Sequence, residues 1–124
     1  MADSGGVATT TMPPSQSELV DRVRAALVGE QTTREVSMFG GRSVMVREKM
    51  VVSALKDGDL LVRVPVDRHD ELVGHRGASQ AEMGAGRSMG PGWIQVAAAS
   101  IDEDDDLRFW ISAALDHNRS VTSG

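Results

Sequence analysis

Four short apolar runs, joined by very short connections, limit the folds open to this chain. Gly40-Gly41 follows the first run, and Asp57-Gly58, a strong signal for a two-residue hairpin, precedes the last. Parallel strands would need crossovers of a dozen or more residues, and the runs lie too close together for that. The sequence therefore predicts an antiparallel meander that stops at Pro65, with strands at residues 36–39, 42–46, 50–55 and 60–64.

A helix is expected before the meander. Ser15 and Glu18 have the spacing of a capping box, and apolar residues then recur at helical intervals from Leu19 to Leu27. Gly29 is placed to end this helix. The preceding residues 1–14 are small and polar, so we expect them to form a disordered tail.

The second half of the sequence carries weaker signals. A short helix is predicted over Asp67–Val73, capped by Asp67, and the glycine-rich residues 77–92 are expected to be mostly loop. Trp93–Val96 is a predicted strand. A last helix begins inside the acidic run and presents one apolar face, formed by Leu107, Trp110, Ile111, Ala114 and Leu115.

Together these elements predict one two-layer α+β domain over residues 15–119, in which the antiparallel meander packs with N- and C-terminal helices. Residues 120–124 are expected to be a second disordered tail.

Composition excludes several classes of function. Thirteen Lys and Arg stand against 18 Asp and Glu, and residues 102–106 are all acidic, so the rest of the molecule is neutral. Without a basic face, the protein is not expected to bind DNA directly. The absence of cysteine excludes disulfides and thiolate metal sites and fits a cytoplasmic protein. Neither a signal peptide nor an apolar membrane-spanning segment is recognisable.

Two catalytic motifs are matched only superficially. His69 and His75 are six residues apart, whereas the helical zinc motif needs a separation of four, so His69 is interpreted as a packing histidine. Gly86-Arg87-Ser88-Met89-Gly90 matches Gly-x-Ser-x-Gly but lacks the strand before it and the helix after it. We therefore predict no catalytic residue, no metal site and no cofactor.

The glycine-rich loop leaves a binding interpretation open. Backbone amides at Gly84 and Gly86, with Arg87 and a nearby Arg76, could hold an anion. A loop folded tightly over the sheet is the favoured alternative. Arg42 joins Arg76 and Arg87 as the first cations to test for any contact with nucleic acid.

The methionines and the acidic run 102–106 each have a structural and a functional interpretation. The methionines could form an adaptable partner surface, although core filling is favoured; they are Met38, Met45, Met50, Met83 and Met89. The acidic run 102–106 could attract a basic partner, but a solvated, solubilising face is favoured.

Two local motifs resemble a known family. Met38-Phe39-Gly40-Gly41 at a hairpin, and later Gly84-Ala85-Gly86-Arg87-Ser88-Met89 before a Trp-led strand, resemble the TfoX N-terminal domain over residues 38–115. The resemblance implies an α-β(3)-α-β(2)-α two-layer fold like that of secretion chaperones, whereas the pattern of this sequence gives four strands before the short helix. The family takes its name from bacterial regulators of natural competence, which act as transcriptional coactivators. It implies no catalytic residues.

These observations predict a non-enzymatic regulatory or protein-interaction module. A stand-alone chaperone-like protein that binds peptides or proteins is the alternative, and an enzyme using Arg87 and the glycine loop is the least favoured. The resemblance implies a link to transcriptional or competence-type regulation, but the sequence ends at Gly124 without the second domain of the regulators, so a DNA-linked role stays open. We expect a protein partner, and a homodimer formed through the sheet.

Overall fold

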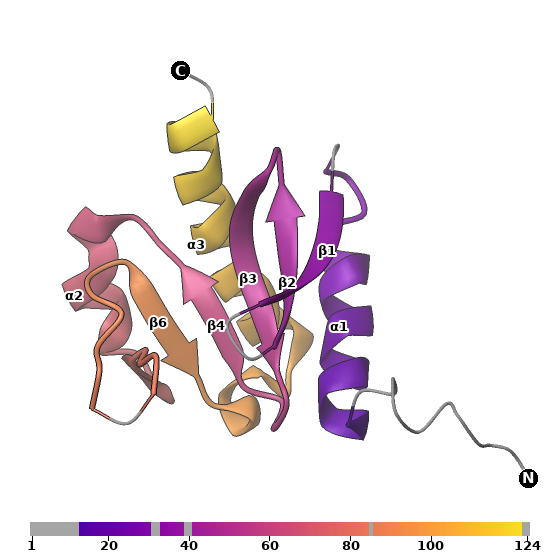
Figure 1. The fold of residues 1–124 in the computed structure, drawn as a ribbon, viewed down its shortest axis with the longest axis horizontal. Helices are drawn as coiled ribbons and strands as arrows, with labels where there is room; N and C mark the ends of the chain where they lie inside the picture. Colours follow the sequence, from indigo (N-terminus) through magenta and orange to yellow (C-terminus); the bar gives the residue numbers. More distant parts are fainter. Residues whose placement is uncertain (1–12, 31–32, 39–40, 85, 123–124) are drawn as a thin grey trace, which may run out of the picture.

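The computed structural model describes residues 13–30, 33–38, 41–84 and 86–122. Figure 1 shows the elements, which follow one another in this order: α1 (Pro14–Ala26), β1 (Thr33–Met38), β2 (Gly41–Val46), β3 (Lys49–Leu55), β4 (Leu60–Arg63), the 3₁₀ helix η2 (Val66–Arg68), α2 (His69–Val73), β5 (Ala78–Gln80), β6 (Trp93–Val96), the 3₁₀ helix η3 (Ala98–Ile101) and α3 (Asp104–Thr122).

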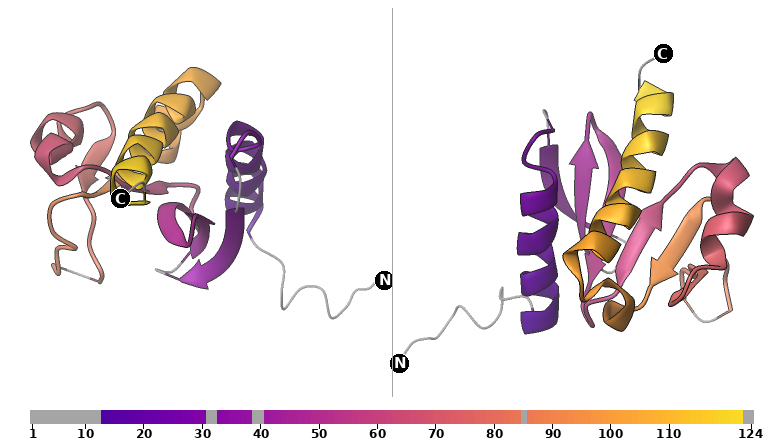
Figure 2. Two further views of the ribbon diagram at one scale, coloured as in Figure 1. Left: turned by 90° about the horizontal axis from the view of Figure 1, so that it is seen from above. Right: turned by 180° about the vertical axis from the view of Figure 1, so that it is seen from behind.

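The strands of the described residues form one antiparallel sheet of six, in the order β1-β2-β3-β4-β6-β5. The α-helices lie on one side of this sheet, as Figure 2 shows from above. The predicted two-layer α+β fold and the antiparallel meander are thus confirmed. Four strands precede α2, as the sequence pattern indicated, and not the three that the family resemblance implied.

The meander turns are built from residues with positive φ. Arg47 and Glu48 adopt φ of 52° and 66° between β2 and β3, and Gly58 adopts 92° between β3 and β4. The Leu55 amide donates to the Asp59 carbonyl at 2.9 Å, which closes the second turn. Positive φ at both Arg47 and Glu48 is the mirror-image turn geometry that matches the twist of a hairpin. The β3–β4 connection instead has three residues between Leu55 and Asp59, with only Gly58 at positive φ, so it is not the predicted two-residue turn.

Gly41 has a different role from the one predicted. It belongs to β2, where it pairs with both Met38 and Leu55, so Gly40-Gly41 is not the two-residue turn. A Cβ at Gly41 would lie 2.5 Å from the Ala54 carbonyl oxygen. Glycine is therefore required here by the close approach of β3. Phe39 and Gly40 lie outside the described residues.

Both terminal helices differ at their ends from the prediction. Helix α1 begins at Pro14 without a side-chain cap, because proline at the first position already has a helical φ, so the Ser15 capping box is wrong. Helix α3 continues to Thr122, where the Thr122 hydroxyl donates to the Asn118 carbonyl at 2.7 Å. Residues 120–122, expected to lie in a tail, are therefore helical.

The region around α2 also differs from the prediction. Residues Val66–Arg68 form η2 and α2 starts only at His69, with no side-chain cap, so Asp67 does not cap it. Within the predicted loop 77–92, Ala78–Gln80 forms β5 because it finds a partner in β6. The predicted strand Trp93–Val96 is confirmed.

The core lies between the sheet and the helices. Its strand contributions include Val44 and Val46 of β2, Val52 of β3, Leu60 of β4 and Ile94 of β6, each 4% exposed or less. Each buried apolar side chain of this size contributes roughly 1.5–3 kcal/mol. The helical side comes mainly from α1 and from the predicted face of α3, whose members are all buried.

Candidate binding surface

The five residues predicted to bind a ligand do not gather at one place. Arg42 lies on β2, separated from β6 by β3 and β4, while Arg76 and Arg87 are exposed beyond opposite ends of β5. The Arg42 charge acts instead on Glu35 of β1, where it adds to the larger effect of Arg24 in lowering the pKa of that carboxyl. Binding at these arginines stays a prediction.

The glycine-rich segment uses its own amides. Residues 82–84 and 86–88 form the two arms of a small hairpin, in which Glu82 bridges Ser88 and the Met83 amide donates to the Arg87 carbonyl at 2.7 Å. The Gly86 amide donates to the Glu82 carboxylate and the Arg87 amide to the Gly84 carbonyl. A Cβ at Gly84 or Gly86 would meet nothing within 4 Å, so these glycines serve only the backbone, with φ of 112° and 74°. Of the two amides predicted to cradle an anion, that of Gly86 is already engaged by the Glu82 carboxylate.

The two histidines of the apparent zinc motif have separate structural environments. His69 is buried, and its Nδ1 accepts the Gly92 amide at 2.8 Å, which ties α2 to the start of β6. This confirms His69 as a packing residue. His75 lies with its ring 4.9 Å from that of Phe109 on α3. Within the described ranges, no cluster of His, Asp and Glu side chains is arranged to hold a metal ion.

The face of the sheet away from the helices has its own side chains. Strand residues alternate between faces, so Met45 points away from its core neighbours Val44 and Val46, and Leu61 points away from Leu60 and Val62. The hairpin of residues 82–88 folds back toward this face, and Figure 2 shows its segment hanging from the side opposite the helices. We call this side the helix-free face.

Four of the five predicted methionines lie on the helix-free face, as the pair Met45 and Met50 and the pair Met83 and Met89, and the side chain of Met38 lies outside the described residues. Met45, Met50, Met83 and Met89 all lie outside the core cluster, although core filling was the favoured interpretation. Met45 is still largely buried, whereas Met83 is 63% exposed, which is unusual for so large an apolar side chain. The reason is topological, because the helices cover only the other face. Met83 and Met89 line one cavity on this face, and flexible methionines of this kind are typical of adaptable binding surfaces.

A groove of about 360 Å³ runs between the hairpin and the sheet. Its floor includes Leu55 and Leu61, and Met83 and Met89 lie on the hairpin side. The carboxylate in the lining, Glu82, accepts the Gly86 amide. Apolar walls with few polar groups are the usual character of a binding groove. We call this cavity the methionine groove.

An arginine and a tryptophan lie beside the groove on paired strands. Arg63 pairs with Trp93, and its guanidinium lies 5.0 Å from the centre of the Trp93 ring. Arg63 Nη1 donates to the carbonyls of Gly92 at 3.1 Å and Val64 at 3.3 Å. A Cβ at Gly92 would collide with this guanidinium, so glycine makes room for it. Sequence reasoning missed Arg63, since only the pairing of β4 with β6 brings it to Trp93.

Burial shapes the electrostatics here. Partial burial lowers the pKa of the Arg63 guanidinium, and no carboxylate among the described residues lies within ion-pair distance of it. Burial also lowers the pKa of His117 on α3, and the Arg63 charge adds to that effect. Arg63 therefore gives the end of β4 a partly desolvated positive charge.

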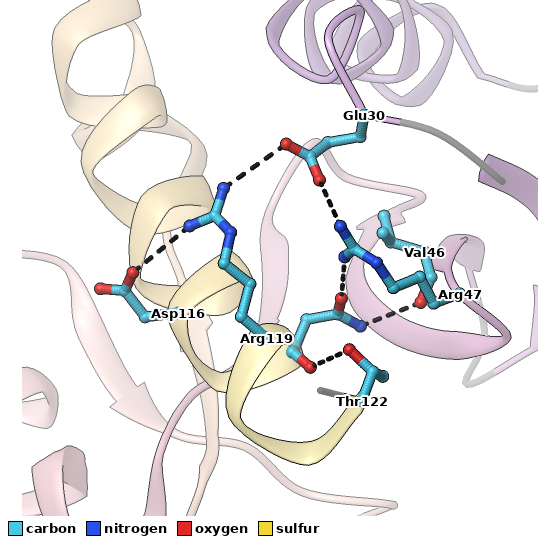
Figure 3. Close-up of polar contacts among 7 residues, drawn as sticks. Glu30, Val46, Arg47, Asp116, Arg119 and Thr122 are labelled. Carbon is cyan, nitrogen blue, oxygen red and sulfur yellow. Dashed lines mark hydrogen bonds and ion pairs between the residues drawn. The ribbon is translucent and has the colours of Figure 1, made fainter. Parts of the chain in front are cut away.

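A cluster of polar side chains, away from the methionine groove, joins the helix layer to the β2–β3 turn (Figure 3). Asn118, 1% exposed, donates to the Val46 carbonyl at 2.9 Å and accepts from Arg47 Nη1 at 2.8 Å. Glu30 lies 3.7 Å from Arg47 and 3.5 Å from Arg119. Each charge faces an opposite charge, so we interpret this cluster as a structural connection between α1, α3 and the turn.

The acidic run is mostly exposed, and its side chains contact Arg22 of α1 and, at 3.7 Å from Asp105, Arg108 of α3. Arg22 of α1 donates to the Asp104 carboxylate at 3.1 Å and to the Ile101 carbonyl at 2.7 Å. Asp102, Glu103 and Asp105 are exposed at the start of α3, as expected for carboxylates near a helix N-terminus.

Comparison with known proteins gives one match. The family model of the TfoX N-terminal domain matches residues 25–118. No curated protein and no solved structure matches the sequence. Among the described helices, none combines the length and the apolar character needed to cross a membrane.

Proposed function

Because the chain belongs to the TfoX N-terminal domain family, we propose that it is a non-enzymatic regulatory module that binds a protein partner on its helix-free face. The observation that carries the proposal is the methionine groove, an apolar cavity beside an exposed Met83. A role in transcriptional or competence-type regulation, and a cytoplasmic location favoured by the cysteine-free sequence, belong to the same proposal.

The same groove supports a second candidate, a chaperone-like protein that binds many unrelated polypeptides. The two functions differ in what is bound. A regulatory module retains one partner in fixed stoichiometry, whereas a chaperone retains a mixture. A second copy of this protein is a third occupant, since the sheet edges β1 and β5 and the helix-free face could all meet a copy.

The test compares two variants that place a charge on an exposed apolar residue. Met83→Glu puts a carboxylate at the groove, and Val28→Glu is the matched control, because Val28 is 86% exposed just after α1. Each protein is immobilised and incubated with a lysate of the native cell, and the retained proteins are quantified by mass spectrometry. Sedimentation of the same variants shows whether a second copy is the partner.

We expect wild type and Val28→Glu to retain the same defined partner, and Met83→Glu to lose it by about tenfold or more, equivalent to roughly 1.4 kcal/mol. A mixture of polypeptides that Met83→Glu loses would establish the chaperone-like alternative. A partner retained equally by all three proteins would contradict a role for the groove.

A further inference from the structure

The methionine groove ends beside an arginine whose charge no described residue neutralises. Leu61 and Arg63 are two residues apart on β4, and so are their partners Gln95 and Trp93 on β6. Residues two apart in a strand share a face, so all four side chains project from the helix-free face. Leu61 and Gln95 line the groove. Arg63 therefore lies about 7 Å farther along the same face, the distance of two residues in a strand.

The guanidinium is only partly used. Its Nη1 donates to the Gly92 and Val64 carbonyls, which leaves the edge formed by Nε and Nη2 without an acceptor among the described residues. A half-buried charge without a counter-ion is unfavourable in the free protein. By contrast, Arg24 has a bidentate carboxylate partner, with Nε and Nη2 at 2.6 and 2.8 Å from Glu35.

The carboxylates in the groove lining and at the start of β4 are engaged elsewhere. Glu82 in the groove accepts the Gly86 amide. Asp59 at the start of β4 accepts from Gln95 Nε2 and from the Ala98 amide, both at 2.9 Å. The open edge of Arg63 is therefore suited to an acceptor supplied by a partner. The planar Nε–Nη2 edge fits a carboxylate in bidentate geometry.

Building on the proposed function, we propose that the partner is an extended peptide segment with an apolar side chain and, two residues away, a carboxylate. The apolar side chain enters the methionine groove, and the carboxylate binds Arg63 over the Trp93 ring. In an extended segment, residues two apart share a face and are separated by about 7 Å, which matches the distance from Leu61 to Arg63. The carboxylate belongs either to an Asp or Glu side chain or to the free C-terminus of the partner.

The experiment is a selection of short random peptides on the purified full-length protein. The peptides are displayed in two formats, internal and with a free C-terminus, so that the two sources of carboxylate are distinguished. The protein variants are Arg63→Met, which removes the charge, and Arg63→Lys, which keeps it without the planar edge. Arg108→Met is the control, because Arg108 is an exposed cation of α3, on the other side of the sheet. Thermal melting verifies that each variant is folded.

Wild type and Arg108→Met should enrich peptides with an apolar residue two positions from a carboxylate. Arg63→Met should keep the apolar preference and lose the acidic one, and Arg63→Lys should fall between them. Enrichment in the internal format identifies a side-chain carboxylate, and enrichment only with free C-termini identifies a terminal one. A second measurement needs no protein variant: replacing the selected carboxylate by its amide should weaken binding to wild type by about tenfold or more.

Two results would overturn the inference while leaving the proposed function intact. One is enrichment of apolar peptides without any acidic preference, and the other is an acidic preference that survives Arg63→Met. If wild type enriches no peptide in either format, both the inference and the proposed groove function fail.

Discussion

Gly41→Ala is the substitution whose effect follows most directly from the structure. The added Cβ would lie 2.5 Å from the Ala54 carbonyl oxygen and 2.8 Å from Ser53 Oγ. The Ala54 carbonyl cannot move freely, because it also accepts Gln16 Nε2 from α1 at 2.9 Å in a buried hydrogen bond. Overpacking of this kind costs about 1–3 kcal/mol, and weakening a buried hydrogen bond adds about 1 kcal/mol.

A loss of about 2–4 kcal/mol in the free energy of unfolding corresponds to a fall in Tm of roughly 10–25 °C for a domain of this size. The matched control is Gly29→Ala, since a Cβ at Gly29 meets nothing within 4 Å and its φ is not in the left-handed region. That variant should be neutral or more stable by up to about 1 kcal/mol. Thermal unfolding followed by circular dichroism measures both. If the two variants melt within about 2 °C of each other, the close approach of β3 to Gly41 is wrong.

Three other predictions concern pH, a buried amide and nucleic acid. Burial disfavours protonated His117 in the folded protein. The free energy of unfolding should therefore fall as the pH drops below about 6.5, the ordinary His pKa, and should level off below the lowered pKa of His117 in the folded protein. In urea unfolding, His117→Gln should lack this pH-dependent loss. The hydrogen bond from Arg24 lowers the pKa of Glu35, so this carboxylate stabilises the fold above its ordinary pKa and loses that effect as the pH falls through its lowered pKa in the folded protein. Glu35→Gln should remove only this loss at lower pH. Asn118→Ala leaves the Val46 carbonyl without its donor and should cost about 1–3 kcal/mol in urea unfolding, whereas the exposed Arg47→Ala should cost less than about 1 kcal/mol. The isolated protein should not bind duplex DNA at physiological salt in a fluorescence anisotropy titration, and sub-micromolar binding with a steep salt dependence would contradict this.

Local patterns were sufficient for most of the secondary structure. The apolar runs of β2–β4, the chain reversal at Asp57-Gly58 and the apolar spacing of α3 each depend on residues close together in the sequence, so the sequence predicts them well. Helix ends were predicted less well. The start of α1 is set by Pro14 and not by a Ser15 cap, and α3 gains a last turn from the Thr122 hydroxyl bond to Asn118.

The candidate site depended on contacts between distant parts of the sequence. Strand β6 enters the sheet between β4 and β5, which brings Arg63 and Trp93 together although about 30 residues of sequence separate them. No local pattern predicts that pairing, because it is selected by the burial that the whole sheet achieves. The predicted cations Arg42, Arg76 and Arg87 remain apart for the same reason.

Composition limits the chemistry available to this protein whatever its fold. The absence of cysteine excludes thiolate sites, and the excess of acidic over basic residues excludes a basic DNA-binding face. Local periodicity likewise determines a meander flanked by amphipathic helices. Which face of the sheet the helices cover is a property of tertiary packing, and that choice places the methionines outside the core and leaves the groove open. Alternation assigns each strand residue to one of two faces, but only the docking of α1 and α3 makes one of those faces the interior.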